Sequence, residues 1–164
     1  MIHRPGWDSY FLSFARLAES RSSCLRRRVG AVIVRDRMVM ATGYNGAPKG
    51  VPHCGEQGCM RQKLGVPSGQ RHELCRGLHA EQNAIIQAAY HGVSIRGGTM
   101  YCTFSPCLIC VKMIINAGLE RVVFLGTYDD PLSSEMAHAS GLTLVQFTEA
   151  GGDPAAGTGA GGGA

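Results

Sequence analysis

The chain has 164 residues, 45% of them apolar and 17% charged, a composition that suits one globular domain with its own core. No apolar stretch approaches the roughly 18 residues of a membrane span, and the N-terminus lacks the basic and apolar segments of a signal peptide. We therefore expect a cytoplasmic protein with no membrane partner. The formal net charge of +4 is too small and too scattered to require nucleic acid as a partner. Seven cysteines without an export signal favour metal binding or catalysis over disulfides.

The first predicted element is a helix within residues 5–21. Apolar side chains recur there at helical spacing, and Asp8 is the candidate N-cap. This pattern predicts that a stripe on one helix face belongs to the core, formed by Trp7, Tyr10, Phe11, Phe14, Leu17 and Ala18.

A β-hairpin and a long insertion follow. Residues 29–36 and 38–45 have β-rich composition and predict two antiparallel strands joined by a tight turn near Asp36 and Arg37. Residues 46–78 are rich in Pro and Gly and show no period. We interpret them as an ordered insertion. So long a loop is unusual inside a compact domain, so we expect a specific contact or bound metal to hold it in place.

The second half alternates helices and strands. Its patterns predict helices at 78–92, 107–118 and 131–141, and strands at 99–104, 121–126 and 142–148. Helices between the last three strands imply parallel pairing there. The expected fold class is α/β, with a mixed five-stranded sheet between helical layers. One domain would span residues 1–149, followed by a flexible Gly/Ala-rich tail at 150–164.

The strongest chemical signal lies at the start of two predicted helices. His79 and Glu81 open one helix, and Pro106-Cys107-Leu108-Ile109-Cys110 opens another. One histidine nitrogen and two thiolates would hold Zn²⁺ and leave its fourth position open for water, as in catalytic zinc sites. Glu81 would move the proton of that water to the base and its leaving amine. This His-x-Glu and Pro-Cys-x-x-Cys arrangement is the signature of zinc nucleobase deaminases.

Further segments make the resemblance more specific. They are Val29-Gly30-Ala31, Thr42 through Pro48 with its Gly-Tyr-Asn-Gly core, His79 through Ile85, and Ser105 through Gly118. On these, the chain resembles the dCMP deaminases of the cytidine deaminase-like superfamily over about residues 5–148. Bacterial members of that family include a product of a DNA-uptake competence operon. The resemblance implies a three-layer α/β/α fold and hydrolysis of dCMP to dUMP, a step toward thymidylate.

Candidate substrate residues combine local chemistry with this resemblance. The amide of Asn45 offers a donor and an acceptor at a turn, suited to a sugar hydroxyl or a base edge. Arg26, Arg27 and Arg28 form the one dense basic run. The resemblance favours Arg26 for the phosphate and adds weaker candidates, namely Ala80, Lys49 and Tyr128.

The insertion suggests a second metal. Cysteines and histidines precede the catalytic motif at spacings suited to ligands, and a closed zinc site would keep a Gly/Pro-rich segment ordered. Some dCMP deaminases carry such a structural zinc. Matching to them gives Cys24 and Cys54, to which we add His72 and Cys75, with Cys59 in reserve. The alternative is that these are ordinary loop side chains. Cys102, within a strand, is expected to be a small buried apolar residue.

Two other function classes remain open. One is a deaminase of another base, such as tRNA adenosine or guanine, and the other is a non-catalytic protein associated with competence. Glu81 argues against the second, since a binding protein does not need that carboxylate. The resemblance further implies a homo-hexamer, activated by dCTP and inhibited by dTTP.

Overall fold

The computed structural model describes residues 4–127 and 130–148. The predicted tail at 150–164 and the candidate Tyr128 lie outside the described residues. No helix in the described ranges has the length and apolar character that a membrane crossing needs.

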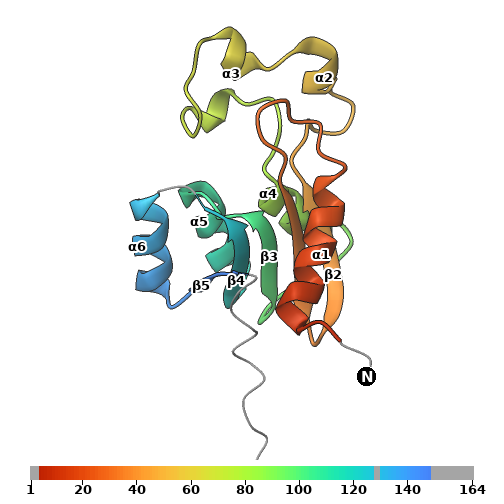
Figure 1. Cartoon of the computed structure of the whole chain (residues 1–164), viewed down its shortest axis with the longest axis vertical. Helices are drawn as coiled ribbons and strands as arrows, with labels where there is room; N and C mark the ends of the chain where they lie inside the picture. The colour runs from red at the N-terminus through yellow and green to blue at the C-terminus, as the bar shows by residue number, and fades with distance from the viewer. Residues whose placement is uncertain (1–3, 128–129, 149–164) are drawn as a thin grey trace, which may run out of the picture.

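A five-stranded mixed sheet forms the centre of the molecule (Figure 1). Its strands lie in the order β2-β1-β3-β4-β5. The antiparallel part pairs β1 with both β2 and β3, whereas β3, β4 and β5 run parallel, so the predicted mixed sheet is confirmed. The strand bounds are β1 Gly30–Arg35, β2 Met38–Tyr44, β3 Thr99–Phe104, β4 Arg121–Gly126 and β5 Thr143–Gln146.

Helices cover both faces of the sheet, which confirms the three-layer arrangement. The helix α1, Trp7–Glu19, packs on one face, and the other face carries α4 Ala80–Tyr90, α5 Leu108–Asn116 and α6 Pro131–Ser140. Successive side chains of a strand point to opposite faces of the sheet, so the core consists of two clusters, one on each face. Ala31 and Ile33 of β1 lie in the cluster with α4 and α5, whereas Val32 and Val34 lie in the cluster with α1.

The hairpin turn is where the sequence predicts it. Asp36 and Arg37 have φ values of 52° and 61°, so both occupy the left-handed region. Two consecutive positive φ angles are typical of a turn whose twist matches that of the flanking strands.

The details of α1 differ from the prediction. Gly6, and not Asp8, is the N-cap. The side chains that α1 buries are Phe11, Leu12 and Ala15, along with Asp8, whereas Trp7 and Leu17 are 39% and 69% exposed. One constraint is a close approach: a Cβ on Gly30 would lie 2.0 Å from the Ala15 carbonyl oxygen. The face of α1 that carries Ala15, together with Phe11 and Leu12, therefore lies against β1.

Asp8 instead joins three elements through a buried ion pair. Its carboxylate accepts hydrogen bonds of 2.9 and 2.6 Å from the Arg121 guanidinium on β4 and one of 2.9 Å from the Tyr101 hydroxyl on β3. Burial alone would raise the pKa of Asp8, but the bonds from Arg121 and Tyr101 outweigh it and hold the pKa below the ordinary value.

An Asp8→Asn variant should lose about 2 kcal/mol of unfolding free energy at pH 7, because the partly exposed Arg121 loses a charged hydrogen-bond acceptor. A lowered folded pKa means that the stabilisation is complete above the ordinary value of 3.8 and is lost as pH falls through the folded value. Urea unfolding at pH 7 and at about pH 2.5 should therefore show the two proteins converging in acid. Asp36→Asn, at a position 90% exposed, is the control. Equal stability at pH 7 would contradict the role of the ion pair.

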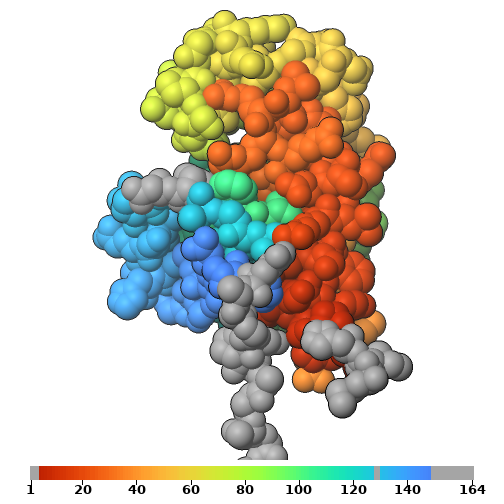
Figure 2. Space-filling view, in the orientation of Figure 1, coloured from red at the N-terminus to blue at the C-terminus, as the bar shows by residue number. Residues whose placement is uncertain are grey.

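The insertion forms a lobe beyond one end of the sheet, seen in yellow in Figures 1 and 2. It contains three short helices, α2 Cys54–Gln57, α3 Met60–Lys63 and the 3-10 helix η1 His72–Leu74. Its two ends are tied together, since Gly46 and Leu78 exchange backbone hydrogen bonds of 3.2 and 2.9 Å. The lobe is therefore anchored at its base, next to the start of α4.

Candidate active site

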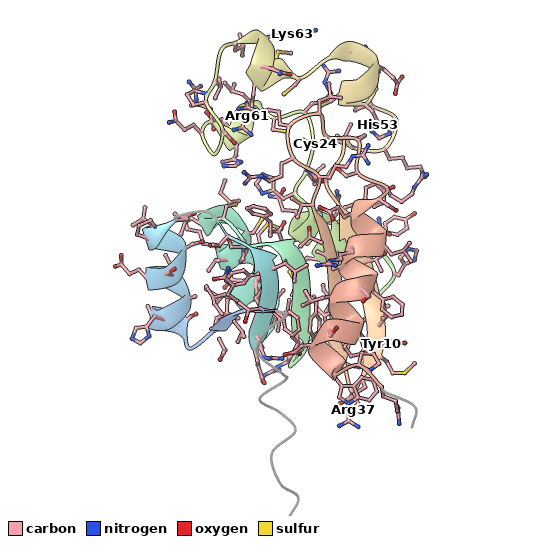
Figure 3. The ribbon with its side chains drawn as sticks, in the orientation of Figure 1. Tyr10, Cys24, Arg37, His53, Arg61 and Lys63 are labelled. Atoms are coloured by element: carbon pink, nitrogen blue, oxygen red, sulfur yellow. The ribbon has the colours of Figure 1, made fainter. Side chains whose placement is uncertain are left out.

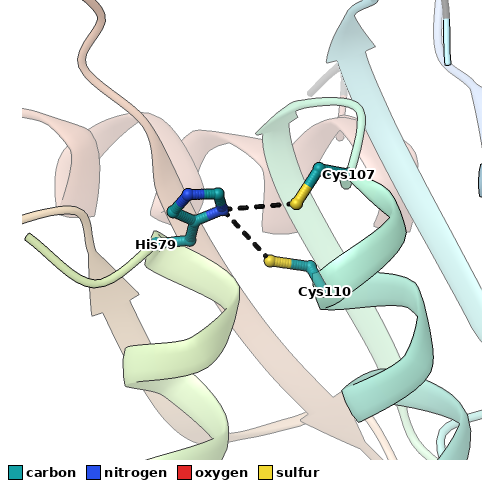
Figure 4. Close-up of side chains that lie close together, drawn as sticks. All are labelled: His79, Cys107 and Cys110. Carbon is teal, nitrogen blue, oxygen red and sulfur yellow. Dashed lines mark hydrogen bonds between the residues drawn. The ribbon is translucent and has the colours of Figure 1, made fainter. Parts of the chain in front are cut away.

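The starts of α4 and α5 meet beside the sheet and bring three predicted ligands together (Figure 4). His79 is the N-cap of α4 and Cys107 is the N-cap of α5. The His79 Nδ1 atom lies 3.4 Å from the Cys107 sulfur and 3.3 Å from the Cys110 sulfur. Within the described ranges, these are the only three His, Cys, Asp or Glu side chains whose donor atoms lie within 4.8 Å of one another.

These distances fit a zinc ion. With Zn–S near 2.3 Å and Zn–N near 2.0 Å, a tetrahedral site separates nitrogen and sulfur ligands by about 3.5 Å. Three protein ligands leave one position for water or substrate, as catalytic zinc requires. The Cys107 thiol is prepared for this role, since a hydrogen bond from Cys110 lowers the pKa of Cys107, against the effect of burial, and His79 lowers it further. The same hydrogen bond, together with burial, raises the pKa of Cys110, so without a metal the pair holds its negative charge on Cys107.

A close helix–strand contact fixes where α4 begins. A Cβ on Gly43 of β2 would lie 2.2 Å from the Ala80 carbonyl oxygen and 2.5 Å from the Ala84 nitrogen. Only glycine allows this approach. The first turn of α4, with the residues it carries, is therefore held directly against the sheet.

Glu81 is buried next to the ligands, in that first turn. Only 4% of it is exposed. Burial raises the pKa of Glu81 to about 7, while the charge of His79 acts in the opposite direction. A carboxyl group with such a pKa can both accept and release a proton near neutral pH, which is the property expected of a proton shuttle.

A cavity of about 340 Å³ opens in front of these groups. Its walls come from the segment before β1, the end of β3, the start of α4 and the inner side of the insertion. Arg26, Arg27 and Arg61 line it, and Glu81 is the only acidic residue among its described lining residues. Figure 3 shows Arg61 in the insertion and Cys24 below it, on the side toward the sheet. The cavity thus combines a metal-ligand set with concentrated positive charge.

The predicted substrate residues divide into two groups. Arg26 and the buried Ala80 line the cavity, and the Arg26 Nη1 donates a 2.9 Å hydrogen bond to the Val66 carbonyl. Lys49 is exposed and is not among the described lining residues, so the structure does not bring it to the site.

Asn45 lines the cavity but its amide is engaged within the protein. Its Oδ1 accepts hydrogen bonds from the Val29 nitrogen at 2.8 Å and the Ser22 hydroxyl at 2.5 Å, and its Nδ2 donates to the Arg27 carbonyl at 2.8 Å. We expected this amide to face a sugar or a base. In this structure it holds the segment that carries the arginines.

Two further arginines contribute positive charge to the cavity, and of these Arg61 was not predicted from the sequence. Arg61 is 8% exposed, donates from Nη2 to the Pro67 carbonyl at 3.2 Å, and has no partner for its buried Nε among the described residues. The Arg27 guanidinium lies 4.1 Å from the centre of the Phe104 ring, a cation–π contact. A lone arginine in an irregular segment carries no pattern, whereas Arg27 belonged to a basic run that was already noted.

The structure places one member of the second set of predicted ligands, His72, beside the first set. His72 lies edge-on to His79, with ring centres 4.9 Å apart, and its Nδ1 is 3.2 Å from the His79 Nε2. Three other cysteines lie near Cys54: burial raises the pKa of Cys54, and the thiols of Cys75, Cys59 and Cys24 raise it further. Cys102 is fully buried, as predicted.

Comparison with known proteins agrees with this site. Residues 5–126 match the family described as the cytidine and deoxycytidylate deaminase zinc-binding region. The chain belongs to this deaminase family. The resemblance inferred from its motifs is thereby confirmed.

Individual members of the deaminase family extend the comparison. Deoxycytidylate deaminase of Schizosaccharomyces pombe is 41% identical over 145 residues, which are 88% of this chain and 45% of that protein, so the chain spans less than half of that relative. ComE operon protein 2 of Bacillus subtilis is 37% identical over 146 residues, covering 88% of this chain and 73% of that protein. The dCMP deaminase of cyanophage S-TIM5, crystallised with dCMP and dUMP, matches with a TM-score of 0.74 and 29% identity, covering 89% of this chain and all of that one.

Proposed function

We propose that this chain catalyses the hydrolytic deamination of dCMP to dUMP. The observation that carries the proposal is one cavity that is lined by His79, Cys107, Glu81 and a group of arginines, with the third ligand, Cys110, buried directly behind it. A nucleotide needs both, since its base meets the reacting groups while its phosphate meets positive charge. The dCMP deaminase of cyanophage S-TIM5, which this chain covers completely, supports the choice of substrate.

The chemistry at the base depends on the metal and on Glu81. A bound Zn²⁺ supplies Lewis acidity and makes a water nucleophilic near neutral pH. His79, Cys107 and Cys110 are the residues that would hold it. The Glu81 carboxylate accepts a proton as water attacks C4 of the cytosine, passes it to N3, and assists the departure of ammonia. Burial of Glu81 directs this proton to the substrate and away from bulk water.

Recognition of the phosphate depends on three fixed guanidinium groups. Arg26 is held by the Val66 carbonyl, Arg27 by the Phe104 ring and Arg61 by the Pro67 carbonyl. These contacts orient the side chains before the ligand arrives, which reduces the entropy lost on binding. Arginine also matches phosphate oxygens in a bidentate manner.

An Arg26→Gln variant tests the substrate directly. Its kcat/KM for dCMP should fall about 10- to 100-fold, the loss expected for a charged hydrogen bond, while any slow turnover of deoxycytidine stays unchanged. Ammonia release from dCMP, CMP, deoxycytidine and guanine is the measurement, with and without dCTP. Arg28→Gln is the matched control, because Arg28 is exposed in the same basic run and is not among the described lining residues.

The same assay separates the alternatives. Deoxycytidine turned over as fast as dCMP would refute phosphate recognition. Turnover of guanine alone, or of adenosine in tRNA, would refute the base assignment. A zinc-loaded protein with no turnover of any base would indicate the non-catalytic function.

The role of Glu81 has its own test. A Glu81→Gln variant should keep zinc and lose roughly three orders of magnitude in kcat, because the proton shuttle is gone while the ligands remain. Zinc content by elemental analysis and the rate of ammonia release check the two halves of this prediction. Retained turnover would contradict the shuttle.

We also propose a second, structural zinc, held by cysteines from the insertion and from the segment before β1. The support is that the Cys75, Cys59 and Cys24 thiols all lie near enough to the buried Cys54 to raise its pKa, so the four cysteines could supply four thiolates if the insertion tightened around a metal. Cys59, first considered as a reserve, takes the position expected for His72, because His72 contacts His79. A closed site here would pin the insertion on the side facing the cavity.

Zinc stoichiometry tests this second site. The purified protein should contain about two zinc ions per chain, and Cys54→Ser or Cys59→Ser about one, because a structural site does not tolerate the loss of a thiolate. Cys102→Ala, outside both sets, should retain two. One zinc in the unaltered chain, with no change in either serine variant, would refute the site.

The remaining properties are proposals from the family resemblance. We propose one catalytic domain over 1–149 with its insertion at 46–78, a cytoplasmic location, a role in supplying thymidylate, and a homo-hexamer regulated by dCTP and dTTP. Sedimentation with and without each nucleotide measures the last of these.

A further inference from the structure

The insertion makes a direct polar contact with the predicted catalytic ligand. We propose that His72 is a positioning residue whose Nδ1 accepts a hydrogen bond from the His79 Nε2–H and so fixes the tautomer in which His79 Nδ1 binds the metal. This inference rests on the proposed metal centre but is independent of the identity of the substrate.

The four ring nitrogens of His79 and His72 and the carbonyl oxygen of Gly69 lie in a row that supports the assignment. The His79 Nδ1 faces both cysteine sulfurs, so it is the nitrogen available to a metal. The other nitrogen of the same ring, Nε2, lies 3.2 Å from the His72 Nδ1, and the His72 Nε2 lies 3.0 Å from the Gly69 carbonyl oxygen.

The metal-binding nitrogen at one end of this row and the Gly69 carbonyl at the other determine which ring nitrogens carry hydrogens. A carbonyl only accepts, so the His72 Nε2 carries a hydrogen and donates it to Gly69. Metal binding through Nδ1 requires that the neutral His79 ring carry its hydrogen on Nε2. The His72 Nδ1 is then the acceptor, and each nitrogen of both rings has one defined role.

The backbone around His72 is arranged to place this ring. Arg71, just before η1, has a φ of 50°, a left-handed conformation that is strained for a residue with a side chain. Gly69 also has a positive φ, 78°, and presents its carbonyl to the ring. The Arg71 and Glu73 side chains pair across the turn, and the Cys75 nitrogen donates to the His72 carbonyl at 3.0 Å.

The contact suits a partner of a metal ligand. Histidines that bind zinc usually donate their second N–H to a carboxylate or a carbonyl, and loss of that partner weakens metal binding about 10- to 100-fold. Here the acceptor is a second imidazole, which is in turn held by a backbone carbonyl. The insertion therefore contributes to the metal centre itself as well as to the cavity wall.

Two substitutions distinguish positioning from packing. His72→Phe keeps a ring but has no acceptor, and should speed zinc loss from the catalytic site to a chelator about 10- to 100-fold. His72→Asn places an amide oxygen near the lost Nδ1 and should recover most of the retention. Exposed His138→Asn on α6 is the control and should match the unaltered chain. The proposal would be refuted if the His72→Asn variant lost zinc as fast as the His72→Phe variant. It would also be refuted if the His72→Phe variant lost zinc no faster than the unaltered chain.

The hydrogen bond can also be observed directly in the unaltered zinc-loaded protein. Nitrogen-15 NMR should show a hydrogen on the His79 Nε2, slow exchange with solvent, and a coupling across the hydrogen bond to the His72 Nδ1. A hydrogen on the His79 Nδ1 would overturn the assignment. So would a His72→Phe protein that loses one zinc per chain while the His79 signals stay unchanged, because His72 would then be a ligand of the second ion.

These readouts separate the inference from the proposed function. Fast zinc loss in His72→Phe, in a protein inactive on dCMP, would support the hydrogen bond and refute the substrate. Unaltered zinc retention in a His72→Phe protein that deaminates dCMP would refute the hydrogen bond alone.

Discussion

The active site depends on two helix starts that are held at close range. The β2 strand carries a glycine, Gly43, at which the first turn of α4 rests directly on the sheet. The α5 helix begins just after β3, so Cys107 and Cys110 face His79 from the other side. Without this approach the two motifs, 28 residues apart, would present unrelated side chains. With it, they form one metal-ligand set next to a buried carboxyl group.

The insertion supplies part of the wall of the active-site cavity. On the inner side it contributes Arg61 to the wall of the cavity and His72 to the far side of the His79 ring. One of its cysteines, Cys54, lies near Cys24, which precedes β1. A segment without regular periodicity thus adds positive charge to the cavity and contacts the His79 ring. This distribution explains why a loop of such length is compatible with a compact domain.

Much of this could be predicted from the sequence. Periodicity and turn chemistry predict the sheet, its parallel half and the hairpin, because these depend on local pattern. The catalytic ligands follow from fixed motif spacing. Other features depend on contacts between distant segments. Asp8 pairs with Arg121, 113 residues away. The Asn45 amide forms hydrogen bonds with Ser22, Val29 and Arg27. The roles of His72 and Arg61 arise from the fold of an aperiodic loop, which no spacing rule describes.

The central claim is that His79, Cys107 and Cys110 form an open metal site in the wall of a nucleotide cavity. Zinc-edge anomalous diffraction from crystals of the zinc-loaded protein tests it most directly. We predict a peak bonded to the His79 Nδ1 and both sulfurs, with the fourth position facing the cavity and Glu81. A peak bound through the His79 Nε2, or one whose fourth position is filled by a protein side chain, would contradict the account.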